Sequence, residues 1–338
     1  NDETDKAMDV FIRLLEVDND TVETHLALGA LFRRRGEVDR ALRVHQNLVA
    51  RPNLDHRYRN RARLELAQDY MKAGVLDRAE GLYLELLEQG MFQDAALSSL
   101  VSIYEKERDW ERAIDATRRQ EKVQGAPEPR RLAQYACEMA EEALWTKDTK
   151  TALQWVKRAL SDDRDCVRAS LLEGRAREAS EDIRGAVKAY RRVARQDARF
   201  VVETLEPLKR CYESLSQQSE WLAYLREQSD QQTLPAVQVA LARESEPAEG
   251  VALLASYLSS TPSWTAFNHL LELNQSELPA TLAAPLQTLH GALRATLASA
   301  PLYACQHCGF SGRAIHWQCP SCRHWASMIP VSDAAKPA

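Results

Sequence analysis

Small residues recur along the chain at an interval close to 34 residues, each followed four and seven positions later by apolar or bulky residues. The positions are Ala7, Ala41, Ala79, Ala113, Ala152, Ala186 and, more weakly, Trp221. The intervals between them are 34, 38, 34, 39, 34 and 35 residues. A unit of 34 residues is the period of the tetratricopeptide repeat, a helix–turn–helix. The pattern therefore predicts an all-α fold, a tetratricopeptide-repeat superhelical solenoid, with loop insertions where the interval is longer.

Two copies of the unit match the repeat most closely. Their matching positions are Leu28-Gly29, Phe32, Gly36, Ala41 and His45 in one, and Leu66-Ala67, Tyr70, Gly74, Ala79 and Tyr83 in the other. In both, a glycine falls at the turn between the helices, where a residue without Cβ can end the first helix in a left-handed conformation. The small alanine that follows lets the second helix approach the first closely. Later copies keep the alanine but decay in the first helix.

Both ends of the array depart from this pattern. Residues 2–18 read as a second helix without its first, which predicts that the partner helix lies upstream in the natural protein. Residues 204–229 stay helical although the repeat weakens. From about residue 234 to 300 the charge drops and five prolines mark expected helix starts or breaks: Pro235, Pro247, Pro262, Pro279 and Pro285. We interpret this stretch as degenerate repeats that cap the array.

A helical array of this kind leaves an extended concave surface, made mostly by the first helix of each pair. The repeat phase places eight polar residues on that surface: Arg33, Arg34, Gln68, Lys72, Ser102, Lys106, Glu141 and Arg175. The set leans basic, which favours a groove that binds an extended or acidic peptide. For any single member, and for the run Arg33-Arg34-Arg35 in particular, the alternative is an ordinary solvated helix face.

The composition is that of an ordinary folded protein and gives no support to an enzyme. The 338 residues are 45% hydrophobic and 28% charged, and the net charge of −5 provides no general attraction for nucleic acid or an anionic membrane. No apolar run approaches the roughly 20 residues that span a bilayer, so we expect the chain as given to be soluble. The P-loop, Rossmann, HExxH and GxSxG motifs are all missing from the sequence. Three scattered cysteines are expected to be buried as small apolar residues: Cys137, Cys166 and Cys211.

The sharpest chemical signal is a pair of CxxC motifs near the C-terminal end. Their cysteines are Cys305, Cys308, Cys319 and Cys322, with ten residues between the two motifs. Each motif can place two thiolates on one ion, so the two complete a tetrahedral S4 shell with no position open for a substrate, which favours a structural metal site. The alternatives are two disulfides, which need an oxidising compartment, or four unrelated thiols, which would rarely fall in this double pattern. Three histidines of the same stretch are surplus to four cysteines: His307, His316 and His324.

Either zinc or iron fits an S4 tetrahedron. The segments Cys308-Gly309 and Cys319-Pro320-Ser321-Cys322 resemble the knuckles of rubredoxin, in which one iron carries one electron. Here the ten-residue gap is much shorter than in rubredoxins, and Arg323 stands where they usually have glycine. We therefore expect one zinc ion, with iron as the alternative.

The stretch around the cysteines is too short to build a core of its own. We expect the metal to replace that core, and Trp317 and Trp325 to pack on an adjacent helix. Only Ala300-Pro301 separates the ribbon from the last helical stretch, which predicts a docked ribbon that clamps the end of the array or forms one wall of its binding surface. The expected organisation is tetratricopeptide-type repeats over residues 1–230, the first one truncated, degenerate repeats over 231–300, a rubredoxin-like zinc ribbon over 301–330 and a disordered tail over 331–338.

The order of repeats and ribbon carries a family resemblance. Tetratricopeptide repeats followed directly by Cys305-Gln306-His307-Cys308-Gly309-Phe310 and His316-Trp317-Gln318-Cys319-Pro320-Ser321-Cys322 resemble the lipopolysaccharide assembly protein B (LapB/YciM) family of Gram-negative bacteria. The resemblance covers essentially the whole chain. It implies that the four cysteines are metal ligands, and that one N-terminal helix, upstream of this chain, holds the protein in the inner membrane with the rest facing the cytoplasm.

The role implied by this resemblance is control of lipopolysaccharide synthesis by an adaptor that is not an enzyme. Such an adaptor promotes degradation of the deacetylase LpxC by the membrane protease FtsH, with a further role in organising other envelope-synthesis proteins. Two alternatives come from other classes: a rubredoxin-type iron electron carrier that docks its reductase through the repeats, and a nucleic-acid-binding ribbon, which the acidic chain disfavours. A third alternative, from the same class, is a tetratricopeptide scaffold for other protein interactions.

Overall fold

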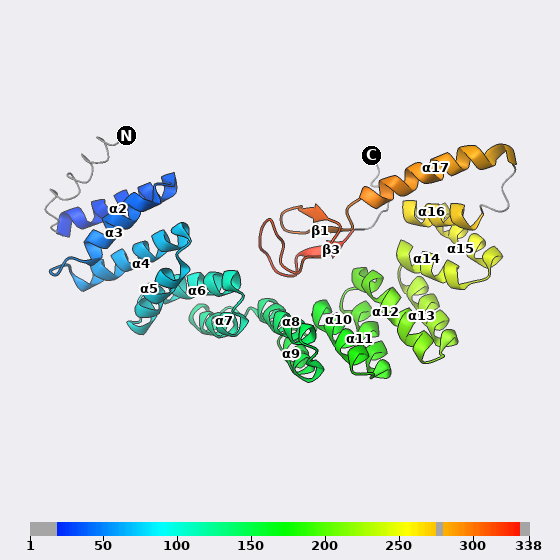
Figure 1. Cartoon of the computed structure of the whole chain (residues 1–338), viewed down its shortest axis with the longest axis horizontal. Helices are drawn as coiled ribbons and strands as arrows, with labels where there is room; N and C mark the ends of the chain where they lie inside the picture. Colours follow the sequence, from blue (N-terminus) through cyan, green and yellow to red (C-terminus); the bar gives the residue numbers. More distant parts are fainter. Residues whose placement is uncertain (1–18, 275–279, 332–338) are drawn as a thin grey trace. The chain divides into compact units, whose positions relative to one another are not determined.

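The computed structural model describes residues 19–274 and 280–331, as paired helices followed by a small antiparallel sheet (Figure 1). Contacts divide the chain into a first unit, residues 1–128, and a second unit, residues 129–338. The predictions made for residues 2–18, for Pro279 and for residues 332–338 concern positions outside the described part.

Three helical pairs make up the described part of the first unit. They are α2 (Asn19–Arg35) with α3 (Val38–Val49), α4 (His56–Ala73) with α5 (Leu76–Glu88), and α6 (Gln93–Glu107) with α7 (Trp110–Gln124). The predicted small residues lie in the second helix of each pair and are fully buried: Ala41, Ala79 and Ala113. Gly36 and Gly74 take the predicted left-handed conformation at the turns, with φ of 84° and 77°.

The second unit continues the pairs and then carries the ribbon. Its helices are α8 (Pro129–Trp145), α9 (Thr149–Asp162), α10 (Val167–Ala179), α11 (Ile183–Gln196), the 3-10 helix η1 (Ala198–Val201), α12 (Val202–Ser214), α13 (Gln218–Gln231), α14 (Pro235–Glu244), α15 (Pro247–Ser260), α16 (Trp264–Leu273) and α17 (Ala280–Ser299). The small-residue positions are again buried in second helices, with Ala152 in α9, Ala186 in α11 and Trp221 in α13. The tetratricopeptide prediction is confirmed in both units.

Close helix approach explains why the repeat pairs a small residue with a ring. A Cβ added to Gly174 in α10 would lie 2.2 Å from the ring of Tyr190 in α11, and one added to Gly29 in α2 would lie 2.4 Å from the ring of His45 in α3. Both rings are buried, so they have no free space to move into. The hydrogen atom of glycine therefore sets the distance between the two helices of these pairs.

Aspartates start several of the second helices. The side chains of Asp109, Asp148 and Asp182 each accept a hydrogen bond from the backbone N–H three residues later, at the starts of α7, α9 and α11. Such a cap stabilises a helix by about 1 kcal/mol because it satisfies a backbone donor that the helix itself leaves unpaired. Each aspartate stands four residues before the buried alanine, so the cap follows the same period as the packing.

The prolines after residue 234 act in different ways. Pro235 and Pro247 occupy the first turns of α14 and α15, as predicted, where a missing N–H costs no hydrogen bond. Pro262 precedes Ser263, whose hydroxyl caps α16. Pro285 was predicted to start or break a helix but lies inside α17. Within the described residues, no helix is both long and apolar enough to cross a bilayer.

The ribbon is a three-stranded antiparallel sheet in the order β2-β1-β3. The strands are β1 (Tyr303–Cys305), β2 (Ser311–Gly312) and β3 (Met328–Pro330). The central strand β1 places Tyr303 opposite Gly312 on one side and opposite Pro330 on the other. Its small core consists of Tyr303, Cys305, Cys319 and Met328, so two of the four CxxC cysteines are also core residues.

Candidate metal centre

The structure brings the four predicted cysteines to one point of the ribbon. The sulfur atoms of Cys305, Cys308, Cys319 and Cys322 all lie within 4.8 Å of one another. The Sγ atoms of Cys305 and Cys322 are 3.7 Å apart, as are those of Cys308 and Cys319. A tetrahedral ion with metal–sulfur bonds of about 2.3 Å requires sulfur–sulfur distances of about 3.8 Å. The donor set therefore fits one tetrahedral metal ion.

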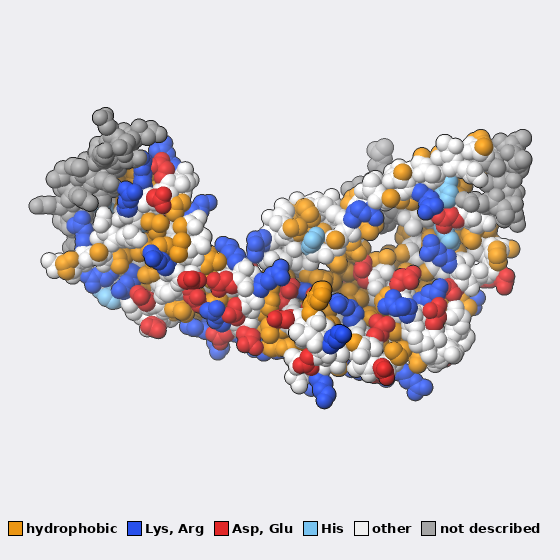
Figure 2. Space-filling view, viewed as in Figure 1, with side chains coloured by type: hydrophobic (Ala, Val, Ile, Leu, Met, Phe, Trp, Pro, Cys, Tyr) orange, Lys and Arg blue, Asp and Glu red, His pale blue; other side chains and the backbone are white. Residues whose placement is uncertain are grey.

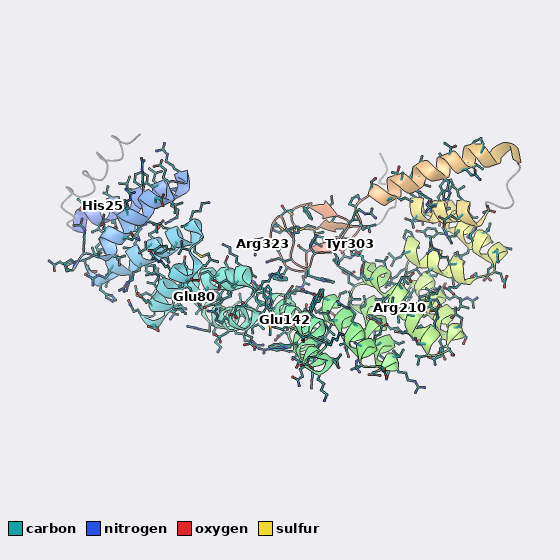
Figure 3. All side chains as sticks on the ribbon, in the orientation of Figure 1. His25, Glu80, Glu142, Arg210, Tyr303 and Arg323 are labelled. Carbon is teal, nitrogen blue, oxygen red and sulfur yellow. The ribbon has the colours of Figure 1, made fainter. Side chains whose placement is uncertain are left out.

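The two CxxC turns have the same backbone form. In the first, the N–H of Gly309 donates to the carbonyl of Cys305 over 3.0 Å; in the second, the N–H of Arg323 donates to the carbonyl of Cys319 over 2.8 Å. Gly309 has φ of 77° and Arg323 has φ of 59°, so both are left-handed. Arg323, labelled in Figure 3, thus holds a conformation that favours glycine, at a cost of roughly 1 kcal/mol.

The thiols of this cluster cannot all ionise easily without a cation between them. Burial works against ionisation of Cys305, but its contact with Ser327 and the backbone N–H groups of Cys308 and His307 outweigh burial and lower its pKa to about 6. The backbone N–H of His324 favours the thiolate of Cys322, yet burial and the three neighbouring thiols raise its pKa to about 12. A bound divalent ion would supply the charge that the last thiolate lacks.

Of the histidines predicted to be surplus to the four cysteines, two lie at the edge of the four-sulfur cluster. His307 and His324 are exposed and stack on each other, with ring centroids 3.5 Å apart. Both have a ring nitrogen within 4.8 Å of the sulfur of Cys322. His316 is also exposed and meets Phe310 edge to face. The three rings therefore belong to the surface of the ribbon.

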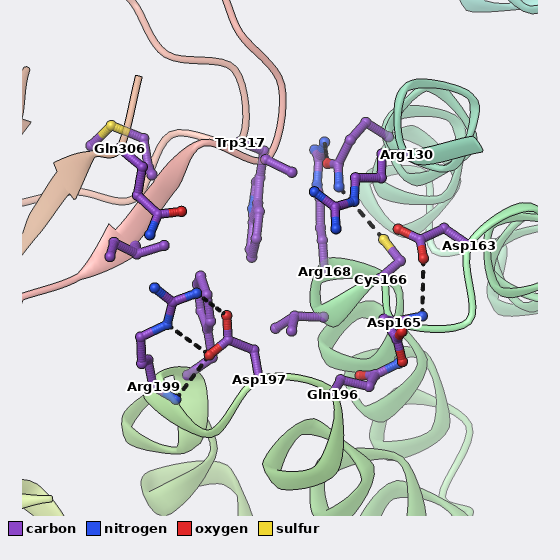
Figure 4. A pocket seen from close by; sticks show the side chains of 16 residues that line it. Arg130, Asp163, Asp165, Cys166, Arg168, Gln196, Asp197, Arg199, Gln306 and Trp317 are labelled. Atoms are coloured by element: carbon purple, nitrogen blue, oxygen red, sulfur yellow. Dashed lines mark hydrogen bonds and ion pairs between the residues drawn. The ribbon is translucent and has the colours of Figure 1, made fainter. Parts of the chain in front are cut away.

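Trp317 attaches the ribbon to the helices. Its ring stacks on Phe200 of η1, with centroids 5.9 Å apart and planes 18° apart, and the guanidinium of Arg168 lies 5.7 Å from its centroid. An apolar cluster surrounds this contact, with Val167 and Val193 from the helices and Ile329 from β3 among its members. Figure 4 shows Trp317 between Arg168 and the segment that carries Arg199.

Further contacts fix the ribbon at two other places. Trp325 meets Tyr135 of α8 edge to face, with centroids 5.6 Å apart. The hydroxyl of Tyr303 donates a short hydrogen bond to the carboxylate of Glu203 in α12. Arg313 donates to the carbonyl oxygens of Leu297 and Ala300 at the end of α17, over 3.2 and 2.7 Å. The ribbon is therefore held by the helix that leads into it and by helices far earlier in the chain.

This placement bears on two predictions. The tryptophans pack on helical elements beside the ribbon, on rings of α8 and η1 that lie far from it in the sequence. The ribbon thus lies over first helices of the repeats, as Figure 1 shows for α8, α10 and α12, instead of clamping the end of the array. Of the two predicted arrangements, a wall of the binding surface is the one that this geometry resembles.

Two of the predicted partner-binding residues are used to join neighbouring repeats of the first unit. Arg33 in α2 donates to Glu65, Gln68 and Asp69 of α4 over 2.7 Å each. Asp69 is fully buried and also lies 2.5 Å from the ring of His45. Arg33 and Gln68 thus have structural contacts, whereas Arg34, Lys72 and Lys106 are exposed and Ser102 is half-buried.

The two candidates of the second unit lie beside the ribbon contact. Glu141 in α8 accepts from buried Arg168 over 2.6 Å and lies 3.4 Å from exposed Arg175. Burial opposes ionisation of Glu141, but Arg168 and Arg175 outweigh it and lower the pKa of this carboxyl. On the face shown in Figure 2, acidic and basic side chains are intermixed over the helices of this unit. Binding of a partner by these residues stays a prediction.

Sequence reasoning missed the helical half of the ribbon contact. Arg168 is 3% exposed and pairs with Glu138 and Glu141, at 2.8 and 2.6 Å, while its guanidinium also faces Trp317. Phe200 lies in η1, between two helices of the repeat pattern. The available signal was indirect: two tryptophans in a very small module require apolar partners outside it.

Comparison with known proteins bears on the whole chain. The family profile described as a rubredoxin metal binding domain matches residues 303–330, and the tetratricopeptide repeat profile matches residues 24–58 and 96–120. Lipopolysaccharide assembly protein B of Escherichia coli (strain K12) is 34% identical over 336 residues, which cover 98% of this chain and 86% of that protein. The protein of the same name from Haemophilus influenzae is 33% identical over 347 residues, covering 98% and 87%. A solved tetratricopeptide repeat protein from Parabacteroides merdae aligns with a TM-score of 0.35 at 12% identity, covering 75% of this chain and 98% of that one.

Proposed function

We propose, from the premise that this chain belongs to the lipopolysaccharide assembly protein B family, that it is a non-enzymatic adaptor in the control of lipopolysaccharide synthesis. The observation that supports this most directly is the position of the ribbon over the first helices of the repeats. First helices form the recognition surface of tetratricopeptide arrays, so a ribbon attached there presents its own residues to the same partner.

The finer proposal is that the adaptor brings the deacetylase LpxC to the membrane protease FtsH. Holding a substrate beside a protease replaces a collision in solution by an encounter at high effective concentration. A rigid surface that combines repeats and ribbon can join two weak contacts in this way. We propose, on the basis of the family resemblance, that the adaptor works at the inner membrane with its repeats and ribbon facing the cytoplasm.

The metal is proposed to be zinc in a structural role. Four cysteine thiolates close the coordination shell, so the ion supplies folding free energy to the ribbon and leaves no position for a substrate. Residues of the ribbon supply its other stabilising contacts. Cys305 and Cys319 fill the small core, and Trp317 packs the ribbon against η1.

The test is degradation of LpxC by FtsH in membranes reconstituted with the full-length, membrane-anchored protein. Changing Cys319 and Cys322 together to Ser removes two ligands and should release the metal, weaken LpxC binding and slow degradation. The matched control is Cys211→Ser, which makes the same chemical change at a buried cysteine of α12 outside the ribbon. This control should leave the metal content, LpxC binding and LpxC degradation unchanged. Normal LpxC binding by the metal-free variant would contradict a structural role of the metal.

The identity of the metal is tested separately on protein purified from iron-replete cells. A zinc site gives a colourless protein with one zinc per chain, because zinc has no d–d or charge-transfer bands in the visible range. A red protein with one iron per chain would instead support the rubredoxin-type electron carrier, since ferric thiolates absorb visible light.

A further inference from the structure

Two cysteines outside the ribbon lie in contact beneath it. Cys137 in α8 and Cys166, the residue that precedes α10, have their Sγ atoms 3.8 Å apart. Both side chains are buried, at 0% and 3% exposure, and both are free thiols. Their burial agrees with the prediction made for each cysteine, but no sequence pattern indicated that the two meet. A dithiol in contact has chemistry that two separate cysteines lack.

The surroundings of Cys166 favour its thiolate. The side-chain amide of Gln134 donates to its sulfur over 3.5 Å. The thiol of Cys137, the backbone N–H of Ala169 in the first turn of α10 and the positive charge of Arg168 lower its pKa, against burial and the charge of Asp163. Burial, together with the neighbouring sulfur of Cys166, raises the pKa of Cys137. The pair therefore consists of one activated thiol and one protonated thiol.

A pocket gives small molecules a route to Cys166. The pocket has a volume of about 240 Å3 and is lined by Cys166 and Arg168 from the helical side and by Gln306 and Trp317 from the ribbon (Figure 4). Cys137 is not among its lining residues. A molecule the size of hydrogen peroxide can thus meet the sulfur of Cys166 first, with Cys137 directly behind it.

We propose that Cys166 and Cys137 form a peroxide-reactive dithiol, in which oxidation at Cys166 is followed by a disulfide between α8 and α10. The thiolate of Cys166 attacks one oxygen of hydrogen peroxide, the O–O bond breaks, and the released hydroxide takes up a proton to leave as water. The sulfur of Cys137 then attacks the sulfenic acid sulfur of Cys166, and a second water leaves as the S–S bond forms. In total, two thiols lose two electrons and two protons, and one peroxide becomes two waters.

Oxidation of this pair acts next to the ribbon contact. A disulfide draws the two sulfur atoms from 3.8 Å to about 2.05 Å. Val167 and Arg168, the next two residues after Cys166, belong to the surface on which Trp317 packs. A change in the redox state of the pair therefore shifts residues that hold the ribbon. This effect does not depend on which partner the adaptor binds. Cellular thiols return the pair to its reduced form by thiol–disulfide exchange.

The experiment treats the metal-loaded full chain with limiting hydrogen peroxide and maps its cysteines by mass spectrometry without reduction. Trypsin cuts after Arg131, Lys147, Arg164 and Arg168, so the disulfide joins a peptide of residues 132–147 to one of residues 165–168. The linked peptide should weigh two hydrogens less than the two parts together and should disappear with a reducing agent. Cys166 should react at least about a hundred times faster than Cys211, because only the thiolate is nucleophilic and the Glu178 carboxylate and burial raise the pKa of Cys211 to about 12.

Two variants separate the steps. Cys137→Ala should leave Cys166 as a sulfenic acid that a dimedone reagent captures. Cys166→Ser removes the reacting sulfur and should abolish both capture and crosslinking, while serine, a good helix cap, preserves the start of α10. Cys211→Ser is the matched control and should form the disulfide at the normal rate. The proposal is overturned if the wild-type chain yields no 137–166 link while its ribbon cysteines oxidise, or if Cys137→Ala leaves Cys166 unmodified. Unchanged melting temperatures of the reduced variants establish that each remains folded.

Discussion

Replacing Trp317 by Ala should detach the ribbon from the helices without removing its metal. Trp317 is not one of the four ligands, and its ring contacts are with Phe200 and Arg168. The stacked pair with Phe200 contributes about 1 kcal/mol beyond simple burial. The buried Arg168 cation above the ring, which is also paired with Glu138 and Glu141, contributes about 1 kcal/mol more. Their sum of about 2 kcal/mol corresponds to a roughly thirtyfold larger population of detached ribbon.

Hydrogen exchange of the metal-loaded full chain measures that population. Amides of η1 and of the first turn of α10 should exchange about thirty times faster in Trp317→Ala, while the zinc content stays at the wild-type value. Trp145→Ala is the matched control, because Trp145 is 83% exposed at the end of α8 and should change neither quantity. A double-mutant cycle with Phe200→Ala should return a coupling of about 1 kcal/mol. Unchanged exchange at η1 in a metal-loaded Trp317→Ala protein would refute the assignment of this contact.

Three further predictions concern stability. Arg323→Gly should stabilise the metal-loaded protein by about 0.5–1 kcal/mol, because glycine relieves the left-handed strain at φ of 59°, and an unchanged or lower chelator midpoint would count against it. Gly174→Ala should destabilise by about 1–3 kcal/mol because its Cβ meets the ring of Tyr190, whereas Gly81→Ala in α5, where the added Cβ meets nothing within 4 Å, should be neutral or stabilising; denaturant melts decide between these outcomes. Burial opposes ionisation of Glu173, but two arginines outweigh it and lower its pKa below the ordinary 4.5, so its contribution is complete above pH 4.5 and is lost as the pH falls through the folded value. Glu173→Gln should therefore flatten the fall of stability below pH 4.5, and equal slopes for both proteins would disprove the contribution.

The helical pairs could be predicted because close packing restricts the residues at a fixed interval. Only a small residue fits where two helices nearly touch, and Ala41, Ala152 and Ala186 are fully buried at such positions. The four cysteines were equally predictable, since a metal shell requires ligands of one kind at short spacing. Both signals are local, so a single sequence contains them.

The contacts of the ribbon could not be predicted in the same way. Phe200 and Glu203 lie about one hundred positions before Trp317 and Tyr303, and no periodic pattern relates residues so far apart. The repeat phase likewise placed Arg33 on a first helix but did not determine its partner. Its ion pairs with Glu65 and Asp69 depend on the distance between neighbouring repeats, which the sequence of one repeat does not specify.

The hydrogen bond from Tyr303 to Glu203 has a mechanical consequence. In an open array each repeat contacts only its neighbours, so a pull on the C-terminal end peels off helices one after another. Here the same pull reaches η1 and α12 directly through the ribbon, and the helices α13 to α17 lie in a bypassed loop that bears no tension until the ribbon comes away. An unfolding protease that grips the C-terminal end would therefore have to break the ribbon contacts in a single event before it could draw on any of these helices.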